Sequence, residues 1–244
     1  MRKLYIDTAN LDDIKRINSF GIIKGVTTNP SLIAKEPKQN FDALIEELAE
    51  FCNKSSLSLS VEVFASEPEE MYKQAKEIHN KLKSIINPNL LRIKIPIGLE
   101  ELSVIKRLSD EDIDVNCTCC FTEQQMQLAA LSGARYVSLF YSRLRDTSGS
   151  PKEVLNRTRD FLYENNLLCE IIAGSIRSQG DVSDAWHTEG KRKLKRNTFL
   201  DYIACSNHLI EQRYTYKGGI CFYGGSAGGL TGGAVANMAP ELFF

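Results

Sequence analysis

The sequence predicts an α/β protein with a closed (β/α)8 barrel, the TIM-barrel architecture. Seven short strand-like segments alternate with longer amphipathic segments, at a spacing of roughly 20–35 residues. Strands that are separated by helical crossovers form a parallel sheet, and so many units in one chain favour a closed barrel. The alternative is a doubly wound open sheet, but no G-x-G-x-x-G follows the first strand.

The expected elements follow one another regularly. Apolar residues that alternate or run together indicate strands at 3–9, 24–30, 57–65, 91–96, 114–121, 136–141 and 169–175. Apolar residues that recur on one face indicate helices at 11–21, 41–53, 67–84, 99–109, 123–132, 151–166 and 179–187. Asn10 is a plausible N-cap of the first helix, Gly21 ends it, and Pro68 suits the first turn of the third.

Polar residues gather at or near the carboxyl ends of these strands. In barrels, active sites are assembled at that end from several strands. The residues concerned are Asp7, Thr27, Thr28, Asn29, Glu62, Lys94, Asn116, Thr118, Ser138, Ser175 and Arg177.

Lys94 stands out because it interrupts the apolar run Leu91–Gly98. A lysine is almost never fully buried without a partner. It could be a snorkelling or gatekeeper lysine at a sheet edge, but a closed barrel has no edges. The functional interpretation is an amine that attacks a ketone and forms a Schiff base, whose iminium then accepts electrons as a C–C bond breaks or forms.

Schiff-base chemistry of this kind also needs a carboxylate and a proton relay through a bound water. Asp7, Glu62 and Thr118 are residues of the right types on the same rim as Lys94. Each also has an ordinary structural interpretation: a strand-end cap for Asp7, an ion pair for Glu62, and a β-branched strand residue for Thr118. Their shared position favours the functional one.

The composition argues against several other classes of protein. With 30 basic and 31 acidic residues the net charge is -1, so we expect neither nucleic acid nor a membrane as a partner. The N-terminus lacks a signal-peptide core, and we expect a cytoplasmic protein. The seven cysteines have no regular spacing and are expected to be reduced thiols. The three histidines have no partners at triad or ligand spacing, so we expect neither a zinc hydrolase nor a histidine-based triad.

Successive motifs resemble those of the short transaldolase family, which is closely related to fructose-6-phosphate aldolase. The likeness covers residues 1–186 with the order kept. The motifs are "YIDTANLDDIK", "GVTTNPSLIAKE", "VEV", "RIKIP", "VNCT", "ARYVSLF" with "SRL", and "AGSIRS".

The resemblance implies a role for each matching residue. Lys94 would be the Schiff-base lysine, Asp7 the acid/base acting on the C4 hydroxyl, and Glu62 with Thr118 the pair that holds a catalytic water. The pocket and the substrate hydroxyl sites would be lined by Thr27, Asn29, Asn116, Ser138 and Phe140. The terminal phosphate would bind Arg143, Ser175 and Arg177, and paired guanidinium groups do bind phosphate well.

Two residues distinguish transaldolase from the aldolase. Phe140 stands where the aldolase has a tyrosine, and Glu62 where it has a glutamine. The resemblance therefore implies transfer of a dihydroxyacetone unit from sedoheptulose 7-phosphate or fructose 6-phosphate to an aldose phosphate, in the pentose phosphate pathway. The alternatives are fructose-6-phosphate aldolase activity, or a catalytically weakened homologue that only binds sugar phosphates.

The likeness breaks after Trp186. Residues 191–196 hold five basic residues, which we interpret as a solvated face, and 199–205 ("FLDYIAC") could form a late eighth strand. Half of the 16 glycines lie between Gly218 and Gly233. The stretch "GGSAGGLTGG" lacks the G-K-[ST] of a phosphate-binding loop and indicates a disordered or loosely packed tail, although an altered reading frame would also break the likeness.

We therefore expect one barrel domain at 1–217 and a glycine-rich tail at 218–244. By resemblance, the protein is expected to need no metal and no cofactor and to assemble as a homo-oligomer, a pentamer or decamer.

Overall fold

The computed structural model describes residues 3–37, 40–176, 195–222 and 227–243. The described residues between 3 and 176 belong to one compact unit, and those from 195 onward belong to a second. The domains expected at 1–217 and 218–244 stay predictions. The two units are described separately.

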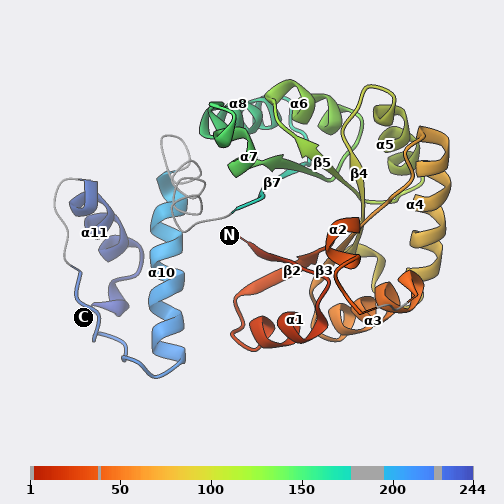
Figure 1. Ribbon diagram of the computed structural model, residues 1–244. Coiled ribbons are helices and arrows are strands. Elements are labelled where there is room, and N and C mark those ends of the chain that lie inside the picture. The colour runs from red at the N-terminus through yellow and green to blue at the C-terminus, as the bar shows by residue number, and fades with distance from the viewer. Residues whose placement is uncertain (1–2, 38–39, 177–194, 223–226, 244) are drawn as a thin grey trace. The chain divides into compact units, whose positions relative to one another are not determined.

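Seven strands form the sheet of the first unit. They are β1 (Leu4–Asp7), β2 (Ile23–Thr27), β3 (Ser58–Glu62), β4 (Leu91–Pro96), β5 (Val115–Cys120), β6 (Tyr136–Phe140) and β7 (Glu170–Gly174). Each strand pairs in parallel with the next along the chain, and the sheet curls with β1 and β7 at its two ends (Figure 1). This is a (β/α)8 TIM-barrel fold, as predicted. The described residues of the unit contain no eighth strand.

Helices connect the strands and lie on the outer side of the sheet (Figure 1). The longer ones are α1 (Leu11–Asn18), α3 (Phe41–Lys54), α4 (Pro68–Leu82), α5 (Glu101–Asp110), α6 (Glu123–Leu131) and α8 (Pro151–Glu164). Every one of these matches a predicted helix to within a few residues. The helix expected at 179–187 lies outside the described residues.

The helix starts follow from local capping. Asn10 accepts a hydrogen bond from the Asp13 N–H at 3.0 Å and caps α1. At α6, Thr122 and Gln125 form a reciprocal capping box, each side chain bonding to the other's backbone N–H. These bonds satisfy N–H groups that the first helical turn leaves without partners.

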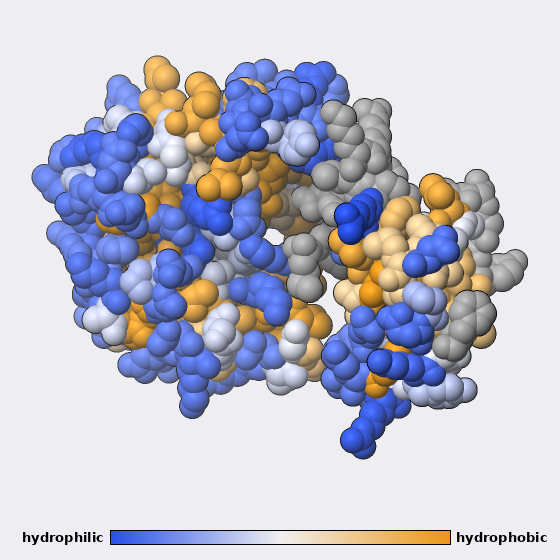
Figure 2. Space-filling model, turned by 180° about the vertical axis from the view of Figure 1, so that it is seen from behind, coloured by the Kyte–Doolittle hydropathy of each residue, from blue (hydrophilic) through white to orange (hydrophobic). Residues whose placement is uncertain are grey.

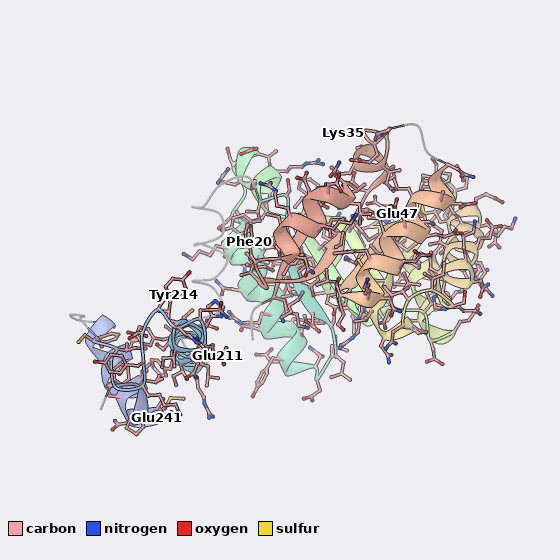
Figure 3. All side chains as sticks on the ribbon, turned by 90° about the horizontal axis from the view of Figure 1, so that it is seen from below. Phe20, Lys35, Glu47, Glu211, Tyr214 and Glu241 are labelled. Carbon is pink, nitrogen blue, oxygen red and sulfur yellow. The ribbon has the colours of Figure 1, made fainter. Side chains whose placement is uncertain are left out.

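The core lies between the sheet and the inner faces of the helices. Ile93 and Ile95 of β4 pack there with helix residues such as Leu48 and Ile105, all fully buried. Charged side chains such as Glu47 on α3 lie on the exposed outer side, and hydrophilic residues dominate the visible surface of this unit (Figures 2 and 3). Burial of these apolar faces is the main force that holds each helix on the sheet.

Two short helices were not anticipated from the sequence. α2 (Pro30–Ile33) follows β2, and α7 (Tyr141–Asp146) follows β6. Both begin at the carboxyl ends of their strands, and they carry or adjoin the predicted site residues Asn29 and Arg143.

The second unit is helical. It contains α10 (Lys195–Glu211), α11 (Ala227–Met238) and the short 3-10 helix η3 (Pro240–Leu242). The suggestion of an eighth strand at 199–205 is wrong, because these residues lie inside α10. Apolar runs this short do not distinguish a strand from a helix.

Part of the glycine-rich tail is helical, because residues 227–238 form α11. Gly232 lies against the Phe222 ring, and a Cβ there would come within 3.1 Å of the ring's Cζ atom and closer still to two others. Glycine is needed at this close approach, even though it costs a helix about 1 kcal/mol relative to alanine.

Several apolar side chains of the second unit are exposed, among them Leu209 and Leu230, and its visible face is more hydrophobic than that of the first unit (Figure 2). Over the described ranges, no helix combines the length and apolarity that a bilayer crossing would require.

Candidate active site

Lys94 lies in the middle of β4 and is buried. Its Nζ atom is 2.8 Å from Oε2 of Glu62, and the two side chains are only 8% and 14% exposed. The parallel register of β3 and β4 places Glu62 directly beside Lys94. A buried ammonium requires a counter-charge, and the neighbouring strand supplies it.

A backbone carbonyl is the second partner of Lys94. The Nζ atom donates a hydrogen bond to the carbonyl oxygen of Thr28 at 2.7 Å. Thr28 follows the end of β2, where the chain turns into α2. Asn29 has an extended backbone and caps that helix by accepting from the Leu32 N–H at 3.0 Å, and Pro30 suits its first turn.

Asp7 pairs with Thr27 at the neighbouring strand ends. The Thr27 hydroxyl donates to Oδ1 of Asp7 at 2.8 Å, and the two residues are register partners of β1 and β2. Asp7 is exposed. Thus Asp7 and Thr27 form one cluster, and Lys94 with Glu62 forms another, two strands away in the same sheet.

Three buried polar residues form a third cluster, next to Lys94. Asn116 is the register partner of Lys94 on β5. Its Oδ1 accepts from the Ser138 hydroxyl at 2.7 Å, and its Nδ2 donates to Oγ of Ser60 at 3.4 Å. The amide of Asn116 is therefore held from both sides.

Ser60 and Thr28 are residues whose contacts the sequence analysis did not anticipate. Ser60 has the same strand parity as Glu62, so the alternation of polar residues along β3 was an available signal. Thr28 was recognised as a rim residue, but its backbone contact with Lys94 is invisible in a sequence.

Thr118, the predicted water-binding residue, is buried near the carboxyl end of β5. The next residue, Cys119, has a left-handed backbone (φ 63°) where the pairing of β5 with β6 shifts register. Burial raises the pKa of the Cys119 thiol, with the Glu62 carboxylate as the next contribution. Cys119 is therefore a neutral thiol at physiological pH rather than a nucleophile.

The predicted phosphate site is partly described. The Arg143 guanidinium carbon on α7 lies 4.5 Å from the centre of the Phe140 ring, a cation–π contact, and Phe140 packs edge-to-face on Phe121 at 5.7 Å. Ser175 follows β7 with a left-handed backbone (φ 57°). Arg177 lies outside the described residues.

The arrangement can support amine chemistry. It offers a buried amine beside a carboxylate, a second carboxylate near the same rim, and amide and hydroxyl groups suited to binding a polyol. Across the described ranges, no three His, Cys, Asp or Glu side chains cluster so that they could hold a metal ion.

Comparison with known families gives a result for the C-terminal region that the sequence analysis missed. Residues 170–244 match the model of the prolyl oligopeptidase family. The stretch G-G-S-A-G at 224–228 fits the G-x-S-x-G pattern of a hydrolase nucleophile turn, which the sequence analysis could have noticed. Ser226 itself lies outside the described residues, and we propose no peptidase chemistry.

The larger match covers the first unit. Residues 4–189 match the family model described as transaldolase/fructose-6-phosphate aldolase. A "Probable transaldolase" of Clostridium kluyveri is 42% identical over 175 residues, which are 72% of this chain and 77% of that protein. One from Oceanobacillus iheyensis is 40% identical over 183 residues, 75% of this chain and 81% of that protein. The chain therefore belongs to the transaldolase/fructose-6-phosphate aldolase family.

Proposed function

We propose that this protein is a transaldolase that transfers a dihydroxyacetone unit from a ketose phosphate to an aldose phosphate through a Schiff base on Lys94. The observation that carries the proposal is the Lys94–Glu62 pair, in which a buried amine in β4 lies 2.8 Å from a carboxylate at the end of β3. A lysine without a chemical role is not expected in the middle of a core strand, because burial of its charge costs free energy.

The first step makes the covalent bond. Lys94 passes a proton to Glu62, and the neutral amine attacks the ketone carbon of the donor. The carbonyl oxygen leaves as water, and the nitrogen becomes a protonated imine. Glu62 is 2.8 Å from Nζ, within reach of that proton.

Bond cleavage and transfer follow. Asp7 takes the proton of the C4 hydroxyl, the C3–C4 bond breaks, and its electron pair flows into the iminium to form an enamine. The aldose leaves, and the enamine carbon attacks the aldehyde carbon of the acceptor, whose oxygen takes the proton back from Asp7. Hydrolysis of the new imine then frees the product and the lysine. Thr118 and Glu62 would hold the water for the hydrolytic step.

The remaining predicted residues would bind the substrate. Thr27, Asn29, Asn116 and Ser138 offer hydroxyl and amide groups to the sugar, and Arg143, Ser175 and Arg177 would bind its terminal phosphate. Support comes from the fixed Asn116 amide and from the Arg143 guanidinium that the Phe140 ring orients.

Fructose-6-phosphate aldolase activity is the second candidate. Glu62 and Phe140 favour transfer, because a phenylalanine cannot donate a proton to a departing enamine as a tyrosine hydroxyl can. A third candidate is a weakened homologue that binds sugar phosphates without turnover. The strand count supports this candidate, because the described residues of the first unit contain seven strands and a complete (β/α)8 barrel has eight.

Borohydride trapping tests the proposal. The protein is incubated with fructose 6-phosphate and borohydride, and its peptides are mapped by mass spectrometry. We expect a three-carbon or ketose adduct on Lys94 that is lost in Lys94→Ala and kept in Lys106→Ala, which removes an exposed lysine of α5. An adduct on another residue, or none, contradicts the proposal.

A coupled assay separates the candidates. Transaldolase activity requires erythrose 4-phosphate as acceptor, whereas rapid release of dihydroxyacetone without an acceptor would favour the aldolase. Ligand-induced thermal stabilisation without either reaction would favour the weakened homologue. A place in the pentose phosphate pathway, a cytoplasmic location and a pentameric or decameric assembly stay predictions.

A further inference from the structure

Thr28 connects the Lys94 site to the backbone of the neighbouring strand. It is fully buried, and it makes two bonds to one atom: its N–H and its hydroxyl donate to the carbonyl oxygen of Ser60 at 3.0 and 3.2 Å. Its own carbonyl oxygen accepts from Lys94 Nζ at 2.7 Å. The side chain of Thr28 thus secures the peptide group that contacts the reactive amine.

The local fold leaves this carbonyl available. Thr28 lies between the last residue of β2 and Asn29, the N-cap of α2. The first intrahelical bond is accepted by the carbonyl of the N-cap, so the carbonyl one residue earlier has no helical partner. It can therefore serve a side chain from β4.

The number of N–H groups on the lysine decreases during the proposed reaction. The ammonium has three, of which Thr28 and Glu62 accept two. When the imine forms, one proton goes to Glu62 and then to the departing oxygen, and another goes directly to that oxygen, which leaves as water. The protonated imine keeps one N–H, and its positive charge is what draws electrons from the breaking bond.

We propose that Thr28 is a positioning residue whose carbonyl oxygen accepts this last N–H and fixes the plane of the iminium, an inference that depends on the proposed Schiff base at Lys94. Glu62 must exchange protons during the reaction, whereas the Thr28 oxygen is held in place throughout. A fixed acceptor stabilises the charged intermediate without having to reorganise.

Substitution of the hydroxyl tests the inference. Thr28→Val keeps the shape of the side chain and the N–H bond to Ser60, but removes the bond from the hydroxyl. We expect kcat to fall about three- to tenfold, the effect of one hydrogen bond, with KM within about twofold of wild type. The rate of borohydride trapping should fall by the same factor, and Thr28→Ser should restore both rates.

Thr158→Val is the matched control. Thr158 is equally buried, but it lies on α8 and its hydroxyl contacts the Met126 sulfur at 3.6 Å. The chemical change is the same, and we expect wild-type kcat. A Thr28→Val protein that is folded by circular dichroism and has wild-type kcat would overturn the inference, as would a serine variant as slow as the valine variant.

A second measurement covers the case in which Thr28→Val does not fold. Replacing the amide between residues 28 and 29 by an ester makes the Thr28 carbonyl a weaker acceptor without altering its side chain. We expect a lower kcat at similar KM, and a wild-type kcat would overturn the inference. Absence of any Lys94 adduct in the wild-type protein is a different result, because it would overturn the proposed function as well.

Discussion

Arg92 and Lys94 stand two residues apart on β4, so their side chains leave the same face of the strand, but they differ in their partners. Lys94 contacts a carboxylate and a carbonyl at under 3 Å. Arg92 is 8% exposed, and its Nη2 atom reaches Asp114 only at 3.5 Å. Its guanidinium carbon lies 5.3 Å from the centre of the Tyr136 ring, and its Nε and Nη1 atoms are buried without a hydrogen-bond partner. Lys94 thus has two close polar partners, whereas Arg92 is paired only weakly.

Replacing Arg92 by methionine should leave the protein as stable or more stable by about 1–2 kcal/mol, because an incompletely paired buried charge costs more than an apolar chain of similar length. Urea unfolding measures the change. Arg107→Met, at an exposed arginine of α5, is the control and should be close to wild type. A loss of more than about 2 kcal/mol in Arg92→Met would contradict the prediction.

Glu62→Gln should destabilise the protein, unlike Arg92→Met. It leaves the Lys94 ammonium buried without its counter-charge, and we expect a loss of about 3 kcal/mol in the free energy of unfolding. Lys94→Met in the same protein should recover part of that loss, which a double-mutant cycle would detect. Glu69→Gln, which breaks an exposed pair with Arg107, is the control. If Glu62→Gln and Glu69→Gln behave alike, Glu62 does not stabilise the buried amine.

Gly25→Ala should be destabilising by about 1–3 kcal/mol. Gly25 lies in β2 between β1 and β3, and an added Cβ would come within 2.7 Å of the Tyr5 ring and closer still to the Ser58 hydroxyl. Gly98→Ala makes a useful comparison, because there the Cβ meets only the Glu101 carboxylate, which can rotate away. Thermal unfolding should show a clear drop for the first variant only, and equal drops would refute the steric argument.

The cysteines should fall into two reactivity groups. Cys205 and Cys221 are exposed, whereas burial raises the pKa of both Cys52 and Cys169 to about 12. Because only the thiolate reacts, raising the pH from 7 to 10 should leave Cys52 slow. Timed alkylation with iodoacetamide and peptide mapping would measure this. Labelling of Cys52 at the rate of Cys205 would mean that the helix α3 opens readily.

Local patterns predicted most of the first unit. The strand 91–96 is recognisable because burial on both faces gives a nearly continuous apolar run. The helix 151–166 is recognisable because burial along one side gives apolar residues at helical spacing. The short helices α2 and α7 show no such pattern, because each contains one turn or little more. The run 199–205 could form a strand or a helix, because its length fits either structure, and it is part of α10.

The rim residues were identifiable one by one, but their contacts were not. Lys94 could be singled out because a charge in an apolar strand is rare, and the parity of β3 could have singled out Ser60. That Glu62 pairs with Lys94, and Asp7 with Thr27, depends on the register of the parallel strands, which local sequence does not encode.

The order of residues along the chain specified seven strands, six of the helices that follow them and the polar groups at the strand ends, because secondary structure responds to periodicity within a few residues. Only the folded sheet decided which of these groups meet, because residues 32 and 66 positions apart become neighbours through strand pairing. The carbonyl of Thr28 beside the amine of Lys94 is the clearest case. Every residue has a carbonyl oxygen, and only the path of the folded backbone decides which of these oxygens lies beside the amine.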